Sequence, residues 1–134
     1  MSGLILKLGP KERVLINGAV IENGDKRSRL AIRTPNANIL RLKDAIHPEE
    51  ATTPVRRVCY ATQLILSGDV DAGEHKLQIL RKVEELSRIL TDDDSRKFLD
   101  EATSAVGEAQ YYRCLKALRA LLPREERLLA ARLQ

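Results

Sequence analysis

The sequence is poor in aromatic residues. Its 134 residues contain no tryptophan, one phenylalanine and three tyrosines, and the first 59 residues contain no aromatic side chain. Stacking of nucleic-acid bases on aromatic rings contributes about 1–3 kcal/mol per base. Any nucleic-acid surface built from the N-terminal residues alone is therefore expected to work without such rings.

Residue types that build catalytic and metal sites are also scarce. His47 lies in an expected linker and His75 on a charged helix surface, and neither stands beside a cysteine or carboxylate pair at ligand spacing. Cys59 and Cys114 form no CxxC pair, which favours reduced thiols packed between helices over a disulfide or a metal site. The carboxylates at 92–94 are explained by helix capping better than by magnesium binding. Nucleophile-elbow, Walker and dinucleotide-binding glycine motifs are absent, so we expect no enzyme activity, no metal and no cofactor.

Long apolar runs are missing as well. The longest aliphatic runs, such as residues 64–66, span only a few positions, whereas crossing a bilayer takes roughly 20 apolar residues. The N-terminal MSGLILKL lacks the charged and long apolar regions of a secretion signal. We expect a cytoplasmic protein without membrane contact.

Positive charge is concentrated near the N-terminus. Residues 1–43 hold nine Lys or Arg and three acids, while the rest of the chain holds fourteen bases and sixteen acids. This asymmetry suggests a polyanionic partner for the N-terminal part. The alternative is solubility combined with chance clustering.

The N-terminal part has the pattern of short β-strands. Leu4, Leu6 and Leu8 alternate with other residues at strand period. Tight turns are predicted at Asn17-Gly18 and, of the same kind, at Asn23-Gly24. The strands are predicted at 4–8, 13–16, 19–22, 28–33 and 39–42. They would form an antiparallel meander or small barrel, which is too small to be stable unless it packs on helices or on a second copy of itself.

The remainder has helical periodicity. Residues 45–53 are a linker candidate, and Thr53-Pro54 predicts a helix start with Gly68 as its stop. Further helices are predicted at about 71–90, from the cap at 91–94 to Gly107, at about 108–122, and after an interruption at Pro123 to near Leu133. The predicted fold class is α+β: a small N-terminal antiparallel β module of four or five short strands (1–47), followed by a C-terminal bundle of four or five α-helices (48–134).

Two phrases carry a family resemblance. LKLGPKERVLINGAVIENGDKRSRL (residues 6–30) and TPVRRVCYATQLILSG (residues 53–68) resemble the FlbT family, the flagellum biosynthesis repressors of α-proteobacteria. The resemblance implies a post-transcriptional regulator that associates with the 5′ untranslated region of flagellin mRNA and controls its stability or translation, with an activating effect in some relatives. It also implies a functional and physical partner, the small protein FlaF.

A more distant likeness supports the RNA-binding part. The strand-turn pattern is similar to that of the carbon storage regulator family, small all-β RNA-binding dimers with interlocked strands; the similarity is carried by residues 4–6, Gly9, residues 15–16 and the segment through Ile46. Leu8 and Gly9 stand where that family has a basic pair, whereas Lys43 stands near its key basic residue. The likeness implies a shared scaffold, a different mode of RNA binding and a homodimer through the β module.

The candidate RNA-binding residues are the cations of the β module. Alternation places Arg29 and Arg33 on one strand face, opposite Leu30 and Ile32. Lys11 could add to phosphate neutralisation. The alternative for each single cation is a solvated strand face. The candidates are Lys7, Arg13, Lys26, Arg27, Arg29, Arg33, Arg41 and Lys43.

A protein-interaction adaptor is the alternative function. The helical half would bind FlaF or flagellin through an amphipathic face, and the effect on the mRNA would be indirect. Tyr111, Tyr112 and Leu115 are the candidate anchors. Leu and Tyr at helical spacing are also typical of a core.

Overall fold

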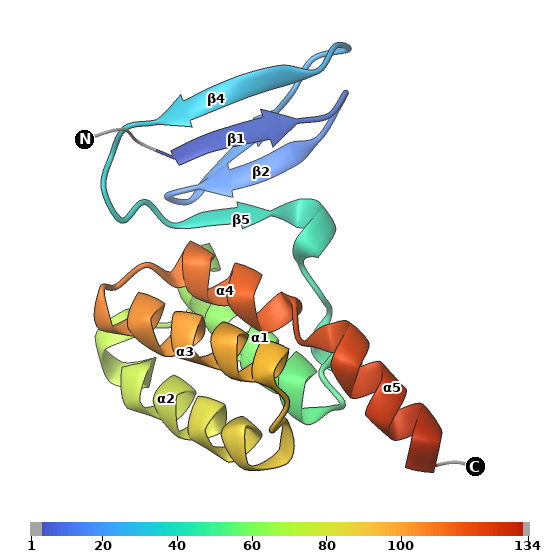
Figure 1. Ribbon diagram of the computed structural model, residues 1–134. Coiled ribbons are helices and arrows are strands. Elements are labelled where there is room, and N and C mark those ends of the chain that lie inside the picture. The colour runs from blue at the N-terminus through green and yellow to red at the C-terminus, as the bar shows by residue number, and fades with distance from the viewer. Residues whose placement is uncertain (1–3, 133–134) are drawn as a thin grey trace.

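The computed structural model describes residues 4–132, which form three layers (Figure 1). A two-stranded sheet lies on a three-stranded sheet, which in turn lies on a layer of helices. The predicted α+β class, with an N-terminal β module and a C-terminal helical bundle, is confirmed.

All strand pairs are antiparallel, but their order differs from a meander. One sheet pairs β1 with β4, and the other has the order β3-β2-β5. Alternation predicts which face of a strand is buried but not its partner. Of the neighbour pairs expected in a meander only β2 with β3 is found, so the meander expectation was wrong for β1, β4 and β5. The strands are β1 (Leu4–Leu8), β2 (Arg13–Ile16), β3 (Ala19–Glu22), β4 (Ser28–Ile32) and β5 (Ile39–Arg41).

The two Asn-Gly turns have different structures. Asn17 and Gly18 both have positive φ, 47° and 85°, which confirms the predicted tight hairpin between β2 and β3. Asn23 instead uses its side chain. Its amide donates to the carbonyl oxygens of Gly9 (2.7 Å) and Lys26 (2.9 Å), and the chain passes from one sheet to the other without a second hairpin.

The facing sides of the two sheets form a small apolar core. Leu6, Leu8, Val14 and Ile39 are buried there, each with at most 3% of its surface exposed. On the other face of the three-stranded sheet, Leu40 belongs to the helical core. Each sheet therefore buries at least one face, as so small a β module requires.

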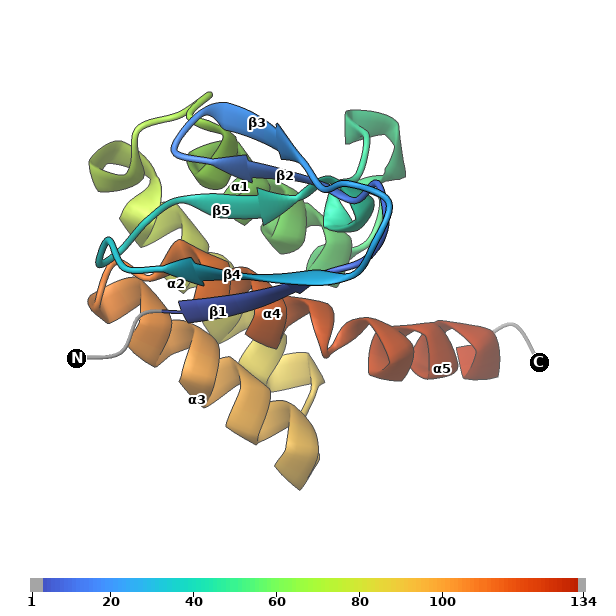
Figure 2. The ribbon, with the colours of Figure 1, turned by 90° about the horizontal axis from the view of Figure 1, so that it is seen from above.

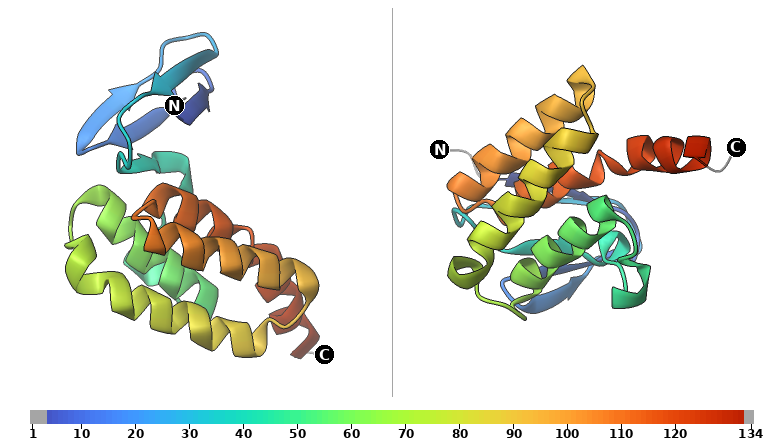
Figure 3. Two further views of the ribbon diagram at one scale, coloured as in Figure 1. Left: turned by 60° about the vertical axis from the view of Figure 1, so that its left-hand side comes forward. Right: turned by 90° about the horizontal axis from the view of Figure 1, so that it is seen from below.

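Four helices pack below the strands and a fifth extends away from them (Figures 2 and 3). The helices are α1 (Pro54–Ser67), α2 (Ala72–Ile89), α3 (Asp93–Gly107), α4 (Tyr111–Arg119) and α5 (Leu122–Arg132), and two short 3-10 turns, η1 (Leu42–Asp44) and η2 (Pro48–Glu50), precede them. Within residues 4–132, no helix has the length and apolar character needed to span a membrane.

The predicted helix ends are largely confirmed. Thr53 accepts a hydrogen bond from the Arg56 amide (3.2 Å), and Gly68 ends α1 in the left-handed conformation with φ 85°. Asp92 accepts from the Ser95 amide (3.1 Å), so its carboxylate is a cap.

Two boundaries differ from prediction. The fourth helix starts at Tyr111 rather than near 108, because the chain turns through Ala109 at φ 58°. The fourth helix ends at Arg119 rather than near 122, so the predicted interruption falls at residues 120–121. Pro123 lies in the first turn of α5, where its missing N–H costs no hydrogen bond. The expected end near Leu133 lies outside the described residues.

Side-chain contacts hold the expected linker and the strands to the bundle. The Gln63 side chain accepts from the Ile46 amide (2.9 Å) and donates to its carbonyl (3.0 Å). Arg119 donates to the Asp44 carbonyl (3.0 Å). Since Tyr112 contacts both apolar clusters, the β module and the helices form one packed unit.

The two cysteines are free and buried between helices. Burial raises the pKa of both Cys59 and Cys114 to about 12. Both thiols are therefore protonated near neutral pH and unreactive.

Candidate nucleic-acid interface

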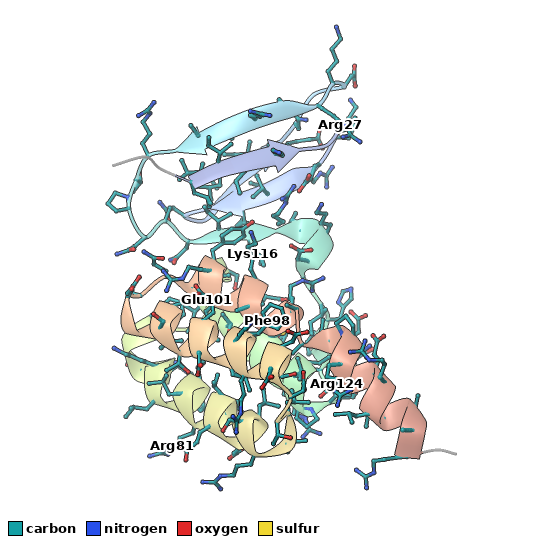
Figure 4. All side chains as sticks on the ribbon, viewed as in Figure 1. Arg27, Arg81, Phe98, Glu101, Lys116 and Arg124 are labelled. Atoms are coloured by element: carbon teal, nitrogen blue, oxygen red, sulfur yellow. The ribbon has the colours of Figure 1, made fainter. Side chains whose placement is uncertain are left out.

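Five of the eight candidate cations surround one hollow of about 540 Å³ at the end of β1 and the start of β4. We call this the cationic hollow. Gly9 and Glu12 also line it, from the turn between β1 and β2. Figure 4 shows Arg27 at this end of the strands, away from the helices. The basic lining residues are Lys7, Arg27, Arg29, Arg41 and Lys43.

Lys7 and Arg29 are two like charges at neighbouring positions in this lining. They are directly opposite each other on β1 and β4, and both are exposed. Like charges at opposite positions destabilise a sheet. Among the described residues neither forms an ion pair with a carboxylate, so the pair concentrates positive charge that an anion would stabilise.

Arg41 has a different environment from the other cations. Its Nε lies 2.6 Å from Glu12 Oε2 and its Nη2 lies 2.8 Å from Glu12 Oε1, with side chains only 16% and 10% exposed. The hydrogen bond from Arg41 lowers the Glu12 pKa to about 2. Arg41 also donates to the Lys7 carbonyl (2.5 Å), and Glu12 accepts from the Gly9 amide (3.0 Å).

This bidentate pair changes the interpretation of Arg41. Its charge is compensated by Glu12, and its hydrogen bonds join β1, β5 and the turn after β1. Arg41 is therefore a positioning residue at the base of the cationic hollow rather than a free phosphate ligand. The sequence does not indicate the Glu12–Arg41 pair, because the two residues are 29 positions apart in the chain.

The remaining β-module cations lie outside the hollow. Arg13 pairs with Glu22, its cross-strand neighbour (2.8 Å), and Lys11 pairs with Asp25 (2.8 Å). Such exposed pairs contribute at most about 1 kcal/mol, but they do compensate the charges. Lys26 is exposed in the loop before β4, and Arg33 lies just after the far end of β4. The eight cations therefore do not form one continuous cluster.

The candidate protein-binding anchors lie mostly inside the bundle. Tyr111 and Leu115 are 5% and 4% exposed and belong to the helical core. The structure thus places these two residues in packing and not on a docking surface. Their spacing on α4 is that of a buried helix face.

Tyr112 was predicted as an anchor but lies between the layers. It is half-buried, contacts both apolar clusters and lies beside Arg41. Burial raises the pKa of Tyr112. Tyr112 therefore brings an aromatic ring from α4 against the β module, which no local pattern could indicate.

The arrangement suits binding of a polyanion. Glu12 is the only acid lining the cationic hollow in the part of the chain that the structure describes, and Arg41 compensates it. Lys7, Arg27, Arg29 and Lys43 remain as a net cluster of positive charge. No group of three or more potential metal-ligating side chains is found within residues 4–132.

Known proteins with similar sequences are flagellar proteins. The family model described as "Flagellar protein FlbT" matches residues 4–129. A protein of Rhodopseudomonas palustris named "Probable flagellum biosynthesis repressor protein FlbT" is 33% identical over 128 residues, covering 95% of this chain and 98% of the relative. The "Flagellum biosynthesis repressor protein FlbT" of Caulobacter vibrioides is 28% identical over 123 residues, covering 92% and 86%.

Another relative, from Caulobacter sp. (strain K31), is 29% identical over 126 residues, covering 94% of this chain and 95% of its own length. It carries the name "Probable flagellum biosynthesis repressor protein FlbT". No solved structure matches the chain significantly. Because the family model spans nearly all of the described residues, the chain belongs to the FlbT family of flagellar proteins.

Proposed function

We propose that this protein regulates flagellin synthesis by binding the 5′ untranslated region of flagellin mRNA through the cationic hollow. The names of its relatives support a regulatory role in flagellum biosynthesis. The observation that carries the RNA-binding step is the uncompensated Lys7–Arg29 pair on neighbouring strands. This like-charged pair destabilises the sheet, and phosphate groups can balance the positive charge that it concentrates.

Phosphate contacts predict that the affinity for RNA falls as the salt concentration rises. Each phosphate neutralised on a single strand contributes about −0.7 to the slope of log affinity against log salt concentration. Engagement of the four free cations of the hollow would give a slope of about −3. Guanidinium groups of Arg27 and Arg29 can also stack on exposed bases.

The test is binding of purified full-length protein to flagellin leader RNA over a range of salt concentrations. Lys7→Glu combined with Arg29→Glu is expected to weaken binding more than about tenfold near 0.1 M salt and to reduce the slope. Arg81→Glu combined with Arg96→Glu, two exposed cations on α2 and α3, makes the same charge change away from the hollow and should have little effect. Flagellin levels in cells carrying each variant report the regulatory consequence.

Two results would overturn the proposal. One is binding that is absent or independent of salt. The other is an equal loss of affinity in both charge-reversal variants, which would indicate a non-specific effect of net charge.

The adaptor function is a second proposal, supported by the placement of α5. This helix projects from the bundle (Figure 3), and Leu129 on it is 39% exposed. A FlaF-like protein or flagellin could pack on such a helix. Loss of partner pull-down in Leu129→Glu, with RNA binding intact, would support the adaptor; unchanged pull-down would count against α5 as the docking element.

A further inference from the structure

A second concave surface lies between the β module and the helices. It has a volume of about 770 Å³ and is bounded by the segment after β4, the start of β5, and α4. We call it the inter-layer groove. Its lining includes Ile32, Pro35, Ile39 and Tyr112, with Arg33 and Lys116 also contributing.

The charges at this groove favour an anionic ligand. Arg33 and Lys116 are exposed, and neither pairs with a carboxylate among residues 4–132. Glu108, which also lines the groove, lies 2.8 Å from Arg113, which pairs with Glu101 as well. These three side chains add one net negative charge against the two positive charges of Arg33 and Lys116. The groove therefore combines apolar walls with a surplus of positive charge.

An aromatic ring is available within it. The Lys116 ammonium lies 5.9 Å from the centroid of the Tyr112 ring, and both residues line the groove. Figure 4 shows Lys116 at the junction of strands and helices. A lysine side chain is flexible and can exchange its place over a ring for a flat ligand while its charge moves to a neighbouring phosphate.

The inter-layer groove and the cationic hollow are built on the same strands. Leu4 of β1 lines the groove and Lys7 lines the hollow; on β4 the corresponding residues are Ile32 and Arg29. Three residues of strand span about 10 Å, and because side chains alternate, the Leu4–Ile32 pair and the Lys7–Arg29 pair lie on opposite faces of the two-stranded sheet. A short extended single strand of nucleic acid that joins the two sites therefore passes around the edge of this sheet.

We propose that the inter-layer groove binds an unpaired base of the same RNA strand whose phosphates occupy the cationic hollow. This inference rests on the proposed function and specifies its ligand as single-stranded RNA. Sequence-specific proteins usually recognise RNA in single-stranded segments, where splayed bases meet aromatic or guanidinium surfaces. The competing occupant, an acidic peptide, would use the cations and apolar walls but would not need the Tyr112 ring.

The experiment compares two probes of equal length and charge: a ten-nucleotide oligouridylate and an abasic RNA oligomer. Wild-type protein should bind the oligouridylate more tightly. Tyr112→Leu, which keeps an apolar side chain between the layers, should reduce that preference by roughly 5-fold or more. Tyr112→Phe keeps the ring and should preserve it. Lys7→Glu combined with Arg29→Glu should weaken both probes alike.

Because Tyr112 contacts both apolar clusters, thermal melts of the variants must accompany these measurements. A second measurement does not depend on a core substitution. Photocrosslinking of wild-type protein to oligouridylate containing 4-thiouridine should label peptides that contain residues 32–37 or 108–116.

The outcomes separate the two proposals. If wild-type protein binds both probes equally, or if Tyr112→Leu folds and keeps the full preference, the base site is overturned while phosphate binding stands. Crosslinks confined to other peptides also overturn it. If neither probe binds but the flagellin leader RNA does, the base site is overturned and the proposed function stands; if the leader RNA does not bind either, the proposed function itself fails. A short Glu-Leu peptide that protects Lys116 from acetylation, where oligouridylate does not, would assign the groove to a peptide.

Discussion

At the scale of single residues, the Glu12–Arg41 pair organises the cationic hollow. Both side chains are largely buried, and the guanidinium is bound by two carboxylate oxygens and a carbonyl. Burial makes the pair costly to break, since either partner alone would be left as an uncompensated charge. The pair thereby fixes β1, which carries Lys7, and the end of β5, after which Lys43 follows in η1.

The same pair predicts a pH dependence of stability. The Glu12 pKa falls from 4.5 to about 2 in the folded protein, so its contribution is fully present above pH 4.5 and is lost as the pH falls toward 2. The contribution is at most about 3 kcal/mol. Glu12→Gln should be less stable at pH 6 and should show a smaller loss of stability between pH 5 and 3, measured by urea unfolding. Equal losses in both proteins over that interval would contradict the assignment.

Residue types indicated part of the site from the sequence. All five basic residues that line the hollow come from residues 1–43, where the excess of cations is visible in the sequence because charge composition is a property of the segment itself. The compensation of Arg41 and the position of Tyr112 could not be predicted. Both depend on contacts between residues distant in the chain.

At the scale of elements, helix ends are set by local chemistry. Gly68 ends α1 at φ 85°, a backbone conformation that is energetically unfavourable for residues with a Cβ. Residues such as Thr53, Gly68 and Asp92 act on their immediate neighbours, which is why the helix ends were predictable. The second Asn-Gly was mispredicted as a hairpin because Asn23 bonds to a segment earlier in the chain.

A pair of glycine substitutions tests the role of Gly68. Gly68→Ala should lower stability by about 1 kcal/mol and Tm by about 4 °C. Gly107 is the matched control: it lies at the end of α3, has no positive φ, and an added Cβ would meet nothing within 4 Å. Gly107→Ala should leave Tm unchanged or raise it slightly. Thermal melts followed by circular dichroism measure both, and equal shifts would contradict the explanation.

At the scale of the whole molecule, the strands and helices share one core. Leu40 of β5 is 3% exposed and packs in the helical cluster, while Tyr112 of α4 packs against both clusters. The sequence predicted both halves as separate patterns, since periodicity describes one element at a time. How the halves join depends on non-local contacts such as that of Gln63 with Ile46.

This shared core predicts a single unfolding transition. Leu40→Ala should destabilise the protein by about 2–5 kcal/mol. Helical circular dichroism reports the bundle, and the tryptophan fluorescence of a Val20→Trp variant, changed at an exposed position of β3, reports the β module. Both should still give the same denaturant midpoint, because loosening the contact affects both halves together. Separate midpoints for the two probes in the protein that carries Val20→Trp alone would show that the halves unfold independently.

The pairing of β1 with β4 affects how the chain folds during its synthesis. Leu4 lies opposite Ile32, so the first strand to leave the ribosome must wait for the fourth before it gains a hydrogen-bonded neighbour. During that interval Leu6 and Leu8 lack their apolar neighbours Leu30 and Ile32 of β4. The rate at which residues 9–32 emerge from the ribosome should thus govern how long the nascent chain is prone to mispairing.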